Sequence, residues 1–190
     1  AHVPAILEAW FPGTEGGNAV ADVLFGDAYP GGKLPVTWPR ATGQAPIYYA
    51  HNLTHQPDTA KDFTSRYWDV ASSPLYPFGY GLSYATFAFT NFKLARTSVL
   101  AGQTLYASVD VANTGSREGS EVAQLYVHQR AGSASRPVRQ LKDFERVPLA
   151  PGEKKTVHFS LSQDELSFWS PQARKWVEEP GTFDLWTGDD

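Results

Sequence analysis

The carboxylates outside the C-terminal half of the chain are the side chains most suited to acid–base chemistry. Of these, Glu15, Asp22, Asp62 and Asp69 are the ones whose positions could place them at a site. Two carboxyl groups that face each other across a cleft can divide the roles of acid, base and nucleophile, because different surroundings shift their pKa values apart. These four residues lie in turns and at positions expected to be exposed, where nothing in the sequence holds two of them face to face. We expect no pair of them to be catalytic.

Arg66, Tyr67, Trp68 and Asp69 are consecutive residues whose types could bind a sugar. Aromatic rings stack on the face of a sugar, and the charged groups can form bidentate hydrogen bonds with its hydroxyls. Alternatively, Arg66 and Asp69 tie their segment to its own domain or to a neighbouring one. The aromatic share of the chain is 14%, and aromatic residues fill cores more often than they stack on ligands. The structural interpretation is favoured, with a sugar subsite as the alternative.

Two histidines, His51 and His55, have the spacing of metal ligands on one helix face. Pro46 and Pro57 favour a loop instead, and no third ligand lies nearby, so no metal site is expected. The chain has no cysteine, which excludes disulfides, thiolate metal sites and a cysteine nucleophile. The glycine-rich turn at residues 13–17 lacks the spacing of a phosphate-binding loop, and no cofactor is expected.

Length and composition indicate a folded protein of one large domain, or of one domain with an attached piece. Of the 190 residues, 42% are hydrophobic and 19% are charged. The net charge is −4 and no lysine–arginine cluster could face phosphates, so no nucleic-acid partner is expected. No apolar run could span a bilayer, and no membrane partner is expected. Because the chain starts without methionine and enters an apolar stretch at once, we expect it to have been cut from a longer protein.

Residues 1–40 predict a fragment of an α/β layer. Ala5–Phe11 is a nearly continuous apolar run, typical of a strand buried on both faces of a parallel sheet. Thr14 is expected to cap a helix that stops at Gly26, and residues 31–39 return to extended chain. These pieces cannot bury their own faces. We therefore expect this segment to be poorly ordered, or to dock onto a sheet that the chain does not contain.

Residues 41–85 have no sustained period and combine several prolines with many aromatic residues. A flexible linker would be rich in glycine and serine and poor in rings. We expect an ordered connecting segment that wraps along a surface with its rings packed down.

Residues 86–190 predict an antiparallel β-sandwich, because apolar and polar residues alternate around Val109, Leu125 and Phe159 and turn signals separate the runs. Residues 164–169 are either a short helical turn or an irregular strand. The expected fold class is mainly β: an immunoglobulin-like, fibronectin type III-like sandwich, preceded by a fragment of an α/β sandwich domain and an aromatic-rich wrapping segment.

Several short motifs occur in an order and spacing that are specific together, although each is weak alone. They are Trp10–Ala19, Asp22–Gly26, Gly32–Thr37, Pro46–Tyr49, Ser65–Tyr67, Leu75–Tyr84, Asn113–Gly115, Glu121–Val127, Arg136–Pro137, Gln140–Phe144 and Pro151–Glu153. In these motifs the chain strongly resembles the C-terminal portion of family 3 glycoside hydrolases, over essentially its whole length. It looks most like the β-glucosidases and β-xylosidases that end in a fibronectin type III-like domain.

This resemblance implies a parent enzyme with a TIM-like barrel, an α/β sandwich and a terminal β-sandwich. In the family the barrel supplies an aspartate nucleophile from a Ser-Asp-Trp type motif. A glutamate of the α/β sandwich, upstream of the segment that matches Pro12–Gly17 here, is the acid/base. This chain has no Ser-Asp-Trp and does not include the region of that glutamate. No catalytic residue can be assigned, and since retaining hydrolysis needs two carboxyl groups about 5–5.5 Å apart, the isolated chain is expected to be inactive.

The implied role is to stabilise a β-glycosidase and to help shape its substrate site. Glu15 either lies in a glycine-rich turn at the rim of that site or is a carboxylate stabilised by a helix dipole, and the second interpretation is favoured. The expected partners are the missing barrel and α/β portions of the parent, and an oligosaccharide. The alternatives are a free-standing carbohydrate-binding module and an interaction module that docks onto a separate catalytic chain. By resemblance, a secreted or periplasmic location is expected.

Overall fold

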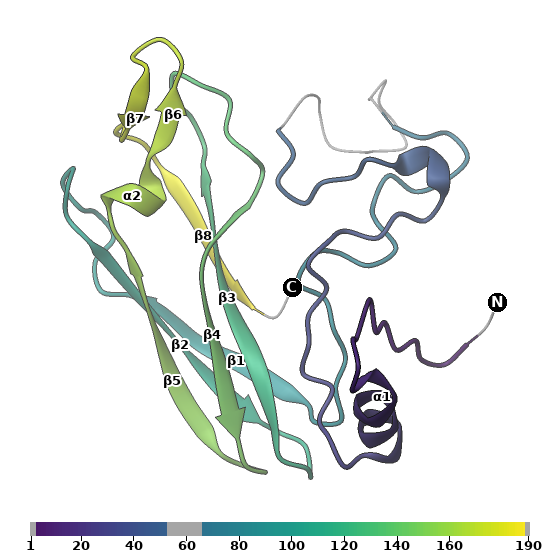
Figure 1. The fold of residues 1–190 in the computed structure, drawn as a ribbon. Coiled ribbons are helices and arrows are strands. Elements are labelled where there is room, and N and C mark those ends of the chain that lie inside the picture. The colour runs from purple at the N-terminus through teal and green to yellow at the C-terminus, as the bar shows by residue number, and fades with distance from the viewer. Residues whose placement is uncertain (1–2, 53–65, 189–190) are drawn as a thin grey trace.

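The computed structural model describes residues 3–52 and 66–188, and strands dominate it. The strands are β1 (Phe87–Leu94), β2 (Leu105–Asn113), β3 (Gly119–Gln129), β4 (Gln140–Leu149), β5 (Lys154–Leu161), β6 (Phe168–Ser170), β7 (Lys175–Val177) and β8 (Phe183–Gly188). The helices are α1 (Gly16–Phe25), the 3-10 helix η1 (Thr42–Gln44) and α2 (Gln163–Leu166). Figure 1 shows the strands gathered in one body, with α1 beside one end of it. Within the described ranges, no helix has the length and hydrophobicity to cross a membrane.

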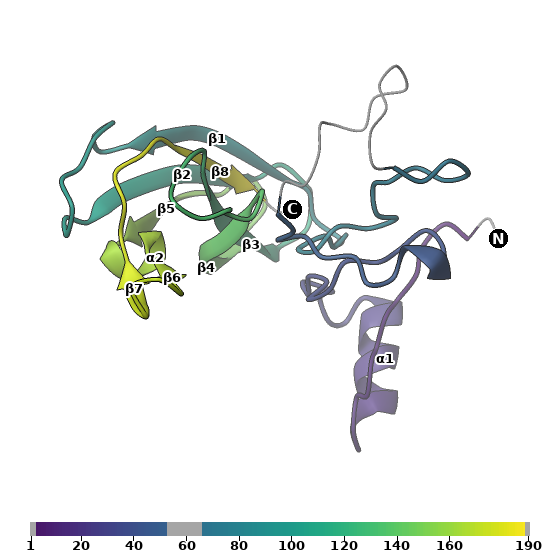
Figure 2. The same cartoon turned by 90° about the horizontal axis from the view of Figure 1, so that it is seen from above.

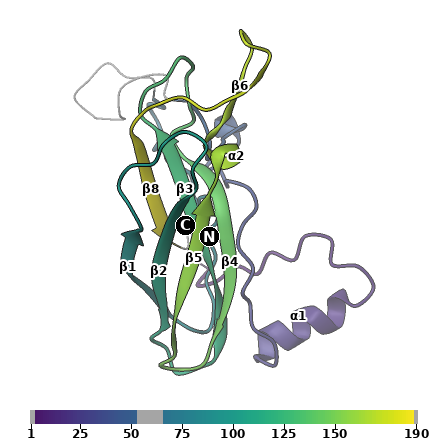
Figure 3. The same cartoon turned by 90° about the vertical axis from the view of Figure 1, so that its left-hand side faces the viewer.

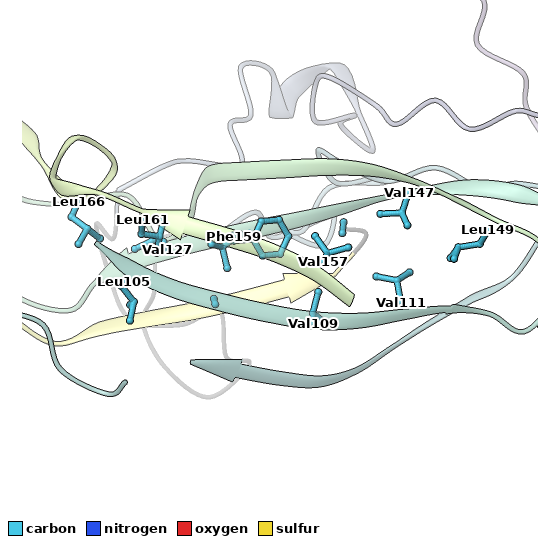
Figure 4. Packing of buried hydrophobic residues seen from close by; sticks show 13 residues of the cluster. Leu105, Val109, Val111, Val127, Val147, Leu149, Val157, Phe159, Leu161 and Leu166 are labelled. Carbon is cyan, nitrogen blue, oxygen red and sulfur yellow. The ribbon is translucent and has the colours of Figure 1, made fainter. Parts of the chain in front are cut away.

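Two three-stranded antiparallel sheets form the predicted β-sandwich. One has the order β1-β2-β5 and the other β4-β3-β8. The alternation predicted from the sequence is confirmed on β2 and β5, where Val109 pairs with Val157 and every second side chain is buried. Figure 4 shows Val109, Val157 and Phe159 among the apolar side chains of the core. Burying such a side chain contributes about 1.5–3 kcal/mol to stability.

A buried asparagine fixes the turn between β2 and β3. Asn113 is 1% exposed, and its Nδ2 donates to the carbonyl oxygens of Arg117 (2.7 Å) and Leu149 (3.1 Å). Its Oδ1 accepts from the backbone N–H of Gly115 at 2.9 Å. Each buried polar group of this side chain therefore has a partner, as burial requires. The turn signal in the sequence thus also supplies a hydrogen-bonded link between the two sheets.

Residues 164–169 contain both of the alternatives expected for them. The short helix α2 begins after Ser162, whose hydroxyl accepts from the backbone N–H of Asp164 (3.2 Å). The Glu165 carboxylate in turn accepts from the backbone N–H of Ser162 (2.7 Å), completing a capping box. Strand β6 follows directly and pairs with β7 as an antiparallel hairpin.

The strand predicted at Ala5–Phe11 is wrong for this chain, because these residues lie outside every helix and strand. A parallel strand needs neighbours that satisfy its two edges, and none exists among the described residues. The helix prediction is confirmed in position but not in its cap. Glu15, not Thr14, is the N-cap residue, and it makes no capping hydrogen bond. Gly26 ends the helix in the left-handed conformation (φ 85°), as predicted. Figures 2 and 3 show α1 standing apart from the sandwich.

The extended chain predicted after α1 is confirmed, and it pairs with the end of the connecting segment. Leu34 N–H donates to the Tyr80 carbonyl and Gly79 N–H donates to the Leu34 carbonyl, both at 2.8 Å. Further along, Trp38 forms an antiparallel bridge with Tyr76. This ribbon leads the chain back to the sandwich and lays it against one of the sheets.

Candidate functional site

The N-terminal segment exposes a set of large apolar side chains that we call the docking surface. Phe11 is 99% exposed and Phe25 is 85% exposed. A proline turn leads from Phe11 into α1: Trp10 and Gly13 adopt left-handed angles, and Gly16 packs so tightly on Pro12 that an added Cβ would lie 2.6 Å from the proline ring. The docking surface consists of Val3, Ile6, Leu7, Trp10, Phe11, Leu24 and Phe25. Clusters of exposed apolar side chains of this kind mark interaction surfaces.

The docking surface is fixed to the sandwich through the C-terminal end of α1. The guanidinium group of Arg117 donates to the carbonyl oxygen of Gly26 at 2.9 Å and lies over the Tyr84 ring, 5.2 Å from its centroid. The Tyr84 hydroxyl donates to the Val23 carbonyl at 2.5 Å. A cation at this position also complements the negative end of the helix dipole. The sandwich therefore orients α1 although the two do not share a core.

A buried ion pair links the segment after α1 to β3. Lys33 Nζ lies 2.7 Å from Glu121 Oε1, and the two side chains are only 12% and 5% exposed. Lys33 also donates to the Gly81 carbonyl at 3.0 Å, and Glu121 accepts from the backbone N–H of Val122 at 2.7 Å. Removal of one partner from such a pair typically costs about 3–5 kcal/mol, because the other charge stays buried without compensation. The sequence analysis missed this pair, since its members are far apart in the chain.

The connecting segment covers the outer face of β3. Strand alternation predicts solvent exposure for Gln124 and Tyr126, yet they are 3% and 2% exposed. Gly79 lies above them: Gln124 Nε2 donates to its carbonyl at 3.4 Å, and Tyr126 donates to Gln124 Oε1 at 2.5 Å. Tyr49 stacks on Phe78 with ring centroids 4.2 Å apart and meets Tyr126 edge-on. For these rings, the expectation of an ordered segment with aromatic residues packed down is confirmed.

The carboxylates considered for catalysis do not form a pair among the described residues. Glu15 precedes α1 and accepts from Asn18 Nδ2 at 2.7 Å, a contact within its own helical turn. Asp22 and Asp69 are exposed, and Asp62 lies outside the described residues. Neither the pocket beside Lys33 and Glu121 nor the one at residues 128–136 is lined by any of the four. What is described of this part of the chain offers no acid and nucleophile facing each other.

The structure brings together Arg66 and Trp68 of the predicted sugar-contacting cluster. The Arg66 guanidinium lies 5.0 Å from the centre of the Trp68 ring, and Trp68 is 79% exposed. The Tyr67 hydroxyl reaches the Gly43 carbonyl at 3.4 Å, while its ring stays 41% exposed. Asp69 is exposed and has no hydrogen bond or ion pair with the residues that the structure describes.

No metal site is found in residues 3–52 and 66–188: no three metal-binding side chains come together there. His51 Nδ1 lies 3.0 Å from the Tyr48 carbonyl oxygen, the geometry of a loop contact. His55 lies outside the described residues.

Comparisons with known proteins divide the chain into two matched regions. Residues 1–84 match the model of the glycosyl hydrolase family 3 C-terminal domain, and residues 121–190 match that of a fibronectin type III-like domain. A periplasmic β-glucosidase of Salmonella typhimurium is 51% identical over 98% of the chain, and a β-xylosidase of Formosa agariphila is 44% identical over 98%. The chain spans 25% of the length of each of these two relatives. A crystal structure of β-glucosidase from Listeria innocua with glucose has a TM-score of 0.90 at 41% identity, covering 96% of this chain and 26% of that one.

Proposed function

Since the chain is a C-terminal portion of a family 3 glycoside hydrolase, with its fibronectin type III-like domain, we propose that it stabilises a β-glycosidase and helps to shape its substrate site without supplying the catalytic groups. The exposed docking surface carries this proposal. An N-terminal segment that exposes Phe11 and Phe25 to solvent has the apolar character of one side of a protein interface. We assign the other half to the remaining α/β sandwich and barrel of the parent enzyme.

The proposed domain organisation follows from this role. Residues 1–40 belong to the α/β sandwich domain of the parent, residues 41–85 are the connecting segment, and residues 86–190 are the β-sandwich. The sandwich holds the docking surface in place through Arg117 and through the Lys33–Glu121 pair. The proposed contribution of the sandwich is therefore to hold α1 and the segment before it in a fixed orientation.

A chimeric enzyme tests the proposal. The C-terminal region of the Salmonella periplasmic β-glucosidase that this chain matches is replaced by the 190-residue chain. We expect the chimera to hydrolyse aryl β-glucosides, and both the truncated enzyme and the isolated chain to give no turnover above the buffer blank. Turnover by the isolated chain would contradict the absence of catalytic groups, and a folded but inactive chimera would contradict the stabilising role.

A matched pair of substitutions locates the interface. Phe11→Asp places a charge on the docking surface, whereas Trp176→Asp changes a less exposed ring (66%) on the β6–β7 hairpin, far from that surface in the sequence. In the isolated chain, neither substitution is expected to lower the melting temperature appreciably, because both rings lie in solvent. In the chimera, Phe11→Asp is expected to cost about 1.5–3 kcal/mol or more, since the ring becomes buried there. Equal effects of both substitutions in the chimera would contradict the assignment.

The parent substrate is proposed to be a β-linked glucoside or xyloside, with residues of this chain beside it. The relatives named above support this class, since one is a β-glucosidase and one a β-xylosidase. Arg66, Tyr67, Trp68 and Asp69 are the proposed substrate-adjacent residues, and Glu15 is a further one. In the chimera, Trp68→Ala is expected to raise KM for a disaccharide several-fold while changing kcat little, because a platform that contacts the ground state and the transition state equally affects binding alone. Unchanged KM for Trp68→Ala would remove this group from the site.

A free-standing carbohydrate-binding module is the second candidate, favoured by the exposure of Trp68. Calorimetric titration of the isolated chain with cellobiose and xylobiose distinguishes the two. Sugar binding that disappears with Trp68→Ala favours the carbohydrate-binding module. If the isolated chain binds neither sugar, the proposal of a non-catalytic C-terminal portion of a β-glycosidase is favoured. We also propose a location outside the cytoplasm, which the periplasmic relative supports.

A further inference from the structure

Residues 66–75, which carry the proposed substrate-adjacent group, belong to no helix or strand of the described chain. The N–H of Leu75 donates to the Trp38 carbonyl at 2.8 Å, at the far end of this segment from Trp68. The Trp68 ring itself is 79% exposed, so no core packing fixes it. Since backbone pairing and burial do not orient Trp68, hydrogen bonds from side chains have to hold the segment around it.

Gln44, the last residue of η1, forms such hydrogen bonds on both sides. Its side chain is buried, with 2% of the residue exposed. Its Oε1 accepts from the backbone N–H of Arg40 at 2.6 Å, and its Nε2 donates to the Ala71 carbonyl at 2.7 Å. We call these two hydrogen bonds the Gln44 clamp. Figure 1 shows η1, drawn in blue, outside the body formed by the strands, so the clamp joins two parts of the connecting segment to each other.

Other contacts across the same junction are exposed. Arg40 Nε donates to the Ser73 carbonyl at 3.0 Å, and the Tyr67 hydroxyl donates to the Gly43 carbonyl at 3.4 Å. Water can replace an exposed partner, whereas a buried amide, N–H or carbonyl group that loses its partner costs about 1–3 kcal/mol. The Gln44 clamp is therefore the contact whose loss would loosen residues 66–75 most.

We propose that Gln44 is a positioning residue for the substrate site of the parent enzyme, which it serves by fixing the direction in which Trp68 points. The inference rests on the proposed function, in which Trp68 lies beside the sugar. Ala71 follows Trp68 by three residues and is held by Gln44, while Tyr67 precedes Trp68 and reaches Gly43, so the ring is held from both sides. Gln44 itself is buried and acts only through this segment.

A fixed ring favours sugar binding because less freedom is lost when the complex forms. The Arg66 guanidinium lies 5.0 Å from the centre of the Trp68 ring and moves with the same segment. Ordering a mobile side chain and its loop on binding is a cost that a preorganised site avoids. Loss of the Gln44 clamp should therefore weaken binding of the ground state and of the transition state alike. In kinetic terms, KM rises while kcat changes little.

Hydrogen–deuterium exchange of the 190-residue chain tests the structural half of this proposal without any sugar. Gln44→Met keeps the length of the side chain and removes both hydrogen bonds. We expect it to speed exchange in a peptide covering residues 66–76 several-fold, while a peptide covering β2 exchanges as in the parent chain. Gln172→Met is the matched control, because Gln172 is exposed in the turn between β6 and β7. Unchanged exchange at residues 66–76 in Gln44→Met would overturn the proposal.

A double-mutant cycle in the chimera tests the functional half. Gln44→Met and Trp68→Ala are each expected to raise KM for cellobiose several-fold with little change in kcat. The double variant Gln44→Met/Trp68→Ala should have the KM of Trp68→Ala alone, because Gln44 has no ring left to position. A general loss of stability would instead act independently of Trp68, and the two effects on KM would multiply.

The outcomes separate this inference from the function on which it rests. Unchanged KM for Trp68→Ala refutes the placement of Trp68 beside the substrate. Raised KM for Trp68→Ala, combined with multiplying effects in the double variant or with no effect of Gln44→Met, refutes the role of Gln44 alone. If Gln44→Met does not fold, Arg40→Met replaces it in both experiments, since it removes the exposed bond to Ser73 from the same segment. It is expected to act in the same direction but more weakly, and no effect of Arg40→Met on exchange or KM would then count against the proposal.

Discussion

Asp110 on β2 is a carboxylate that accepts hydrogen bonds from three different side chains. It accepts from Asn91 Nδ2 (2.8 Å), Thr156 Oγ1 (2.7 Å) and Lys154 Nζ (3.0 Å). These bonds, from Asn91 first, hold the pKa of Asp110 far below its ordinary value of 3.8. A lowered pKa in the folded state means that the unfolded state takes up a proton first as the pH falls. The stabilisation is therefore complete at neutral pH and is lost on acidification.

The expected consequence is an acid-sensitive sandwich whose sensitivity depends on Asp110. The free energy of unfolding should fall as the pH is lowered from about 5 through the ordinary carboxyl pKa. In Asp110→Asn the loss over the same range should be smaller, while the variant is less stable than the parent chain at pH 7. Urea unfolding curves recorded from pH 7 to pH 3 measure both slopes. Parallel pH profiles for the two proteins would show that Asp110 is not the group responsible.

At the scale of elements, β3 is buried on both faces because the connecting segment covers its outer face. Gly79 is the residue of that segment that lies against Gln124 and Tyr126 of β3. Gly79 has φ 87°, and an added Cβ would lie 2.6 Å from Gln124 Oε1 and 3.0 Å from the Tyr126 hydroxyl. Gly79→Ala is expected to destabilise the chain by about 2 kcal/mol or more, because it adds left-handed strain and displaces a buried hydrogen bond. Thermal unfolding measures the loss. Gly43→Ala is the control, since an added Cβ there meets nothing within 4 Å, and a similar loss for both variants would rule out the contact as the cause.

The elements that the sequence predicts well are those whose signal is local. Alternation around Val109 and Phe159, the turn at Asn113 and the stop at Gly26 all act over a few residues. The double burial of Tyr126 could not be predicted, because the residues that cover it come from the aromatic connecting segment, which has no period. The strand predicted at Ala5–Phe11 failed for a related reason: its pattern is that of a central strand, and the sheet partners are not among the described residues.

On the scale of the whole molecule, the docking surface predicts how the isolated chain behaves in solution. Exposed apolar side chains at Phe11 and Phe25 are expected to drive concentration-dependent self-association, since apolar surface leaves water on contact. The double variant Phe11→Asp/Phe25→Asp should remain monomeric over the concentration range in which the parent chain associates. Sedimentation velocity measures this directly. A contrary result would be that the double variant still associates and that association is lost only when Trp169 and Trp176 are replaced. That result would assign the self-association surface to the β6–β7 hairpin.

Whether a candidate site can be predicted from the sequence also depends on how far apart its residues lie in the chain. The group at Arg66–Asp69 can be proposed from the sequence because its members are consecutive. By contrast, Gln129 and Arg136 contact Glu179 and Phe168, which come from other elements. The Lys33–Glu121 pair is equally non-local. Such sites depend on which loops meet at one end of a sandwich. Neither alternation nor turn signals contain that information.

The cover on β3 also limits how this sandwich can be transplanted. Cutting the chain just before Phe87 would leave β1 to β8 intact but would strip Tyr49, Phe78 and Gly79 from above Gln124 and Tyr126. Glu121 would lose Lys33 in the same cut. A graft onto a foreign enzyme must therefore begin upstream of Lys33. The shortest segment that can be transferred with its contacts intact is therefore longer than the β-sandwich domain itself.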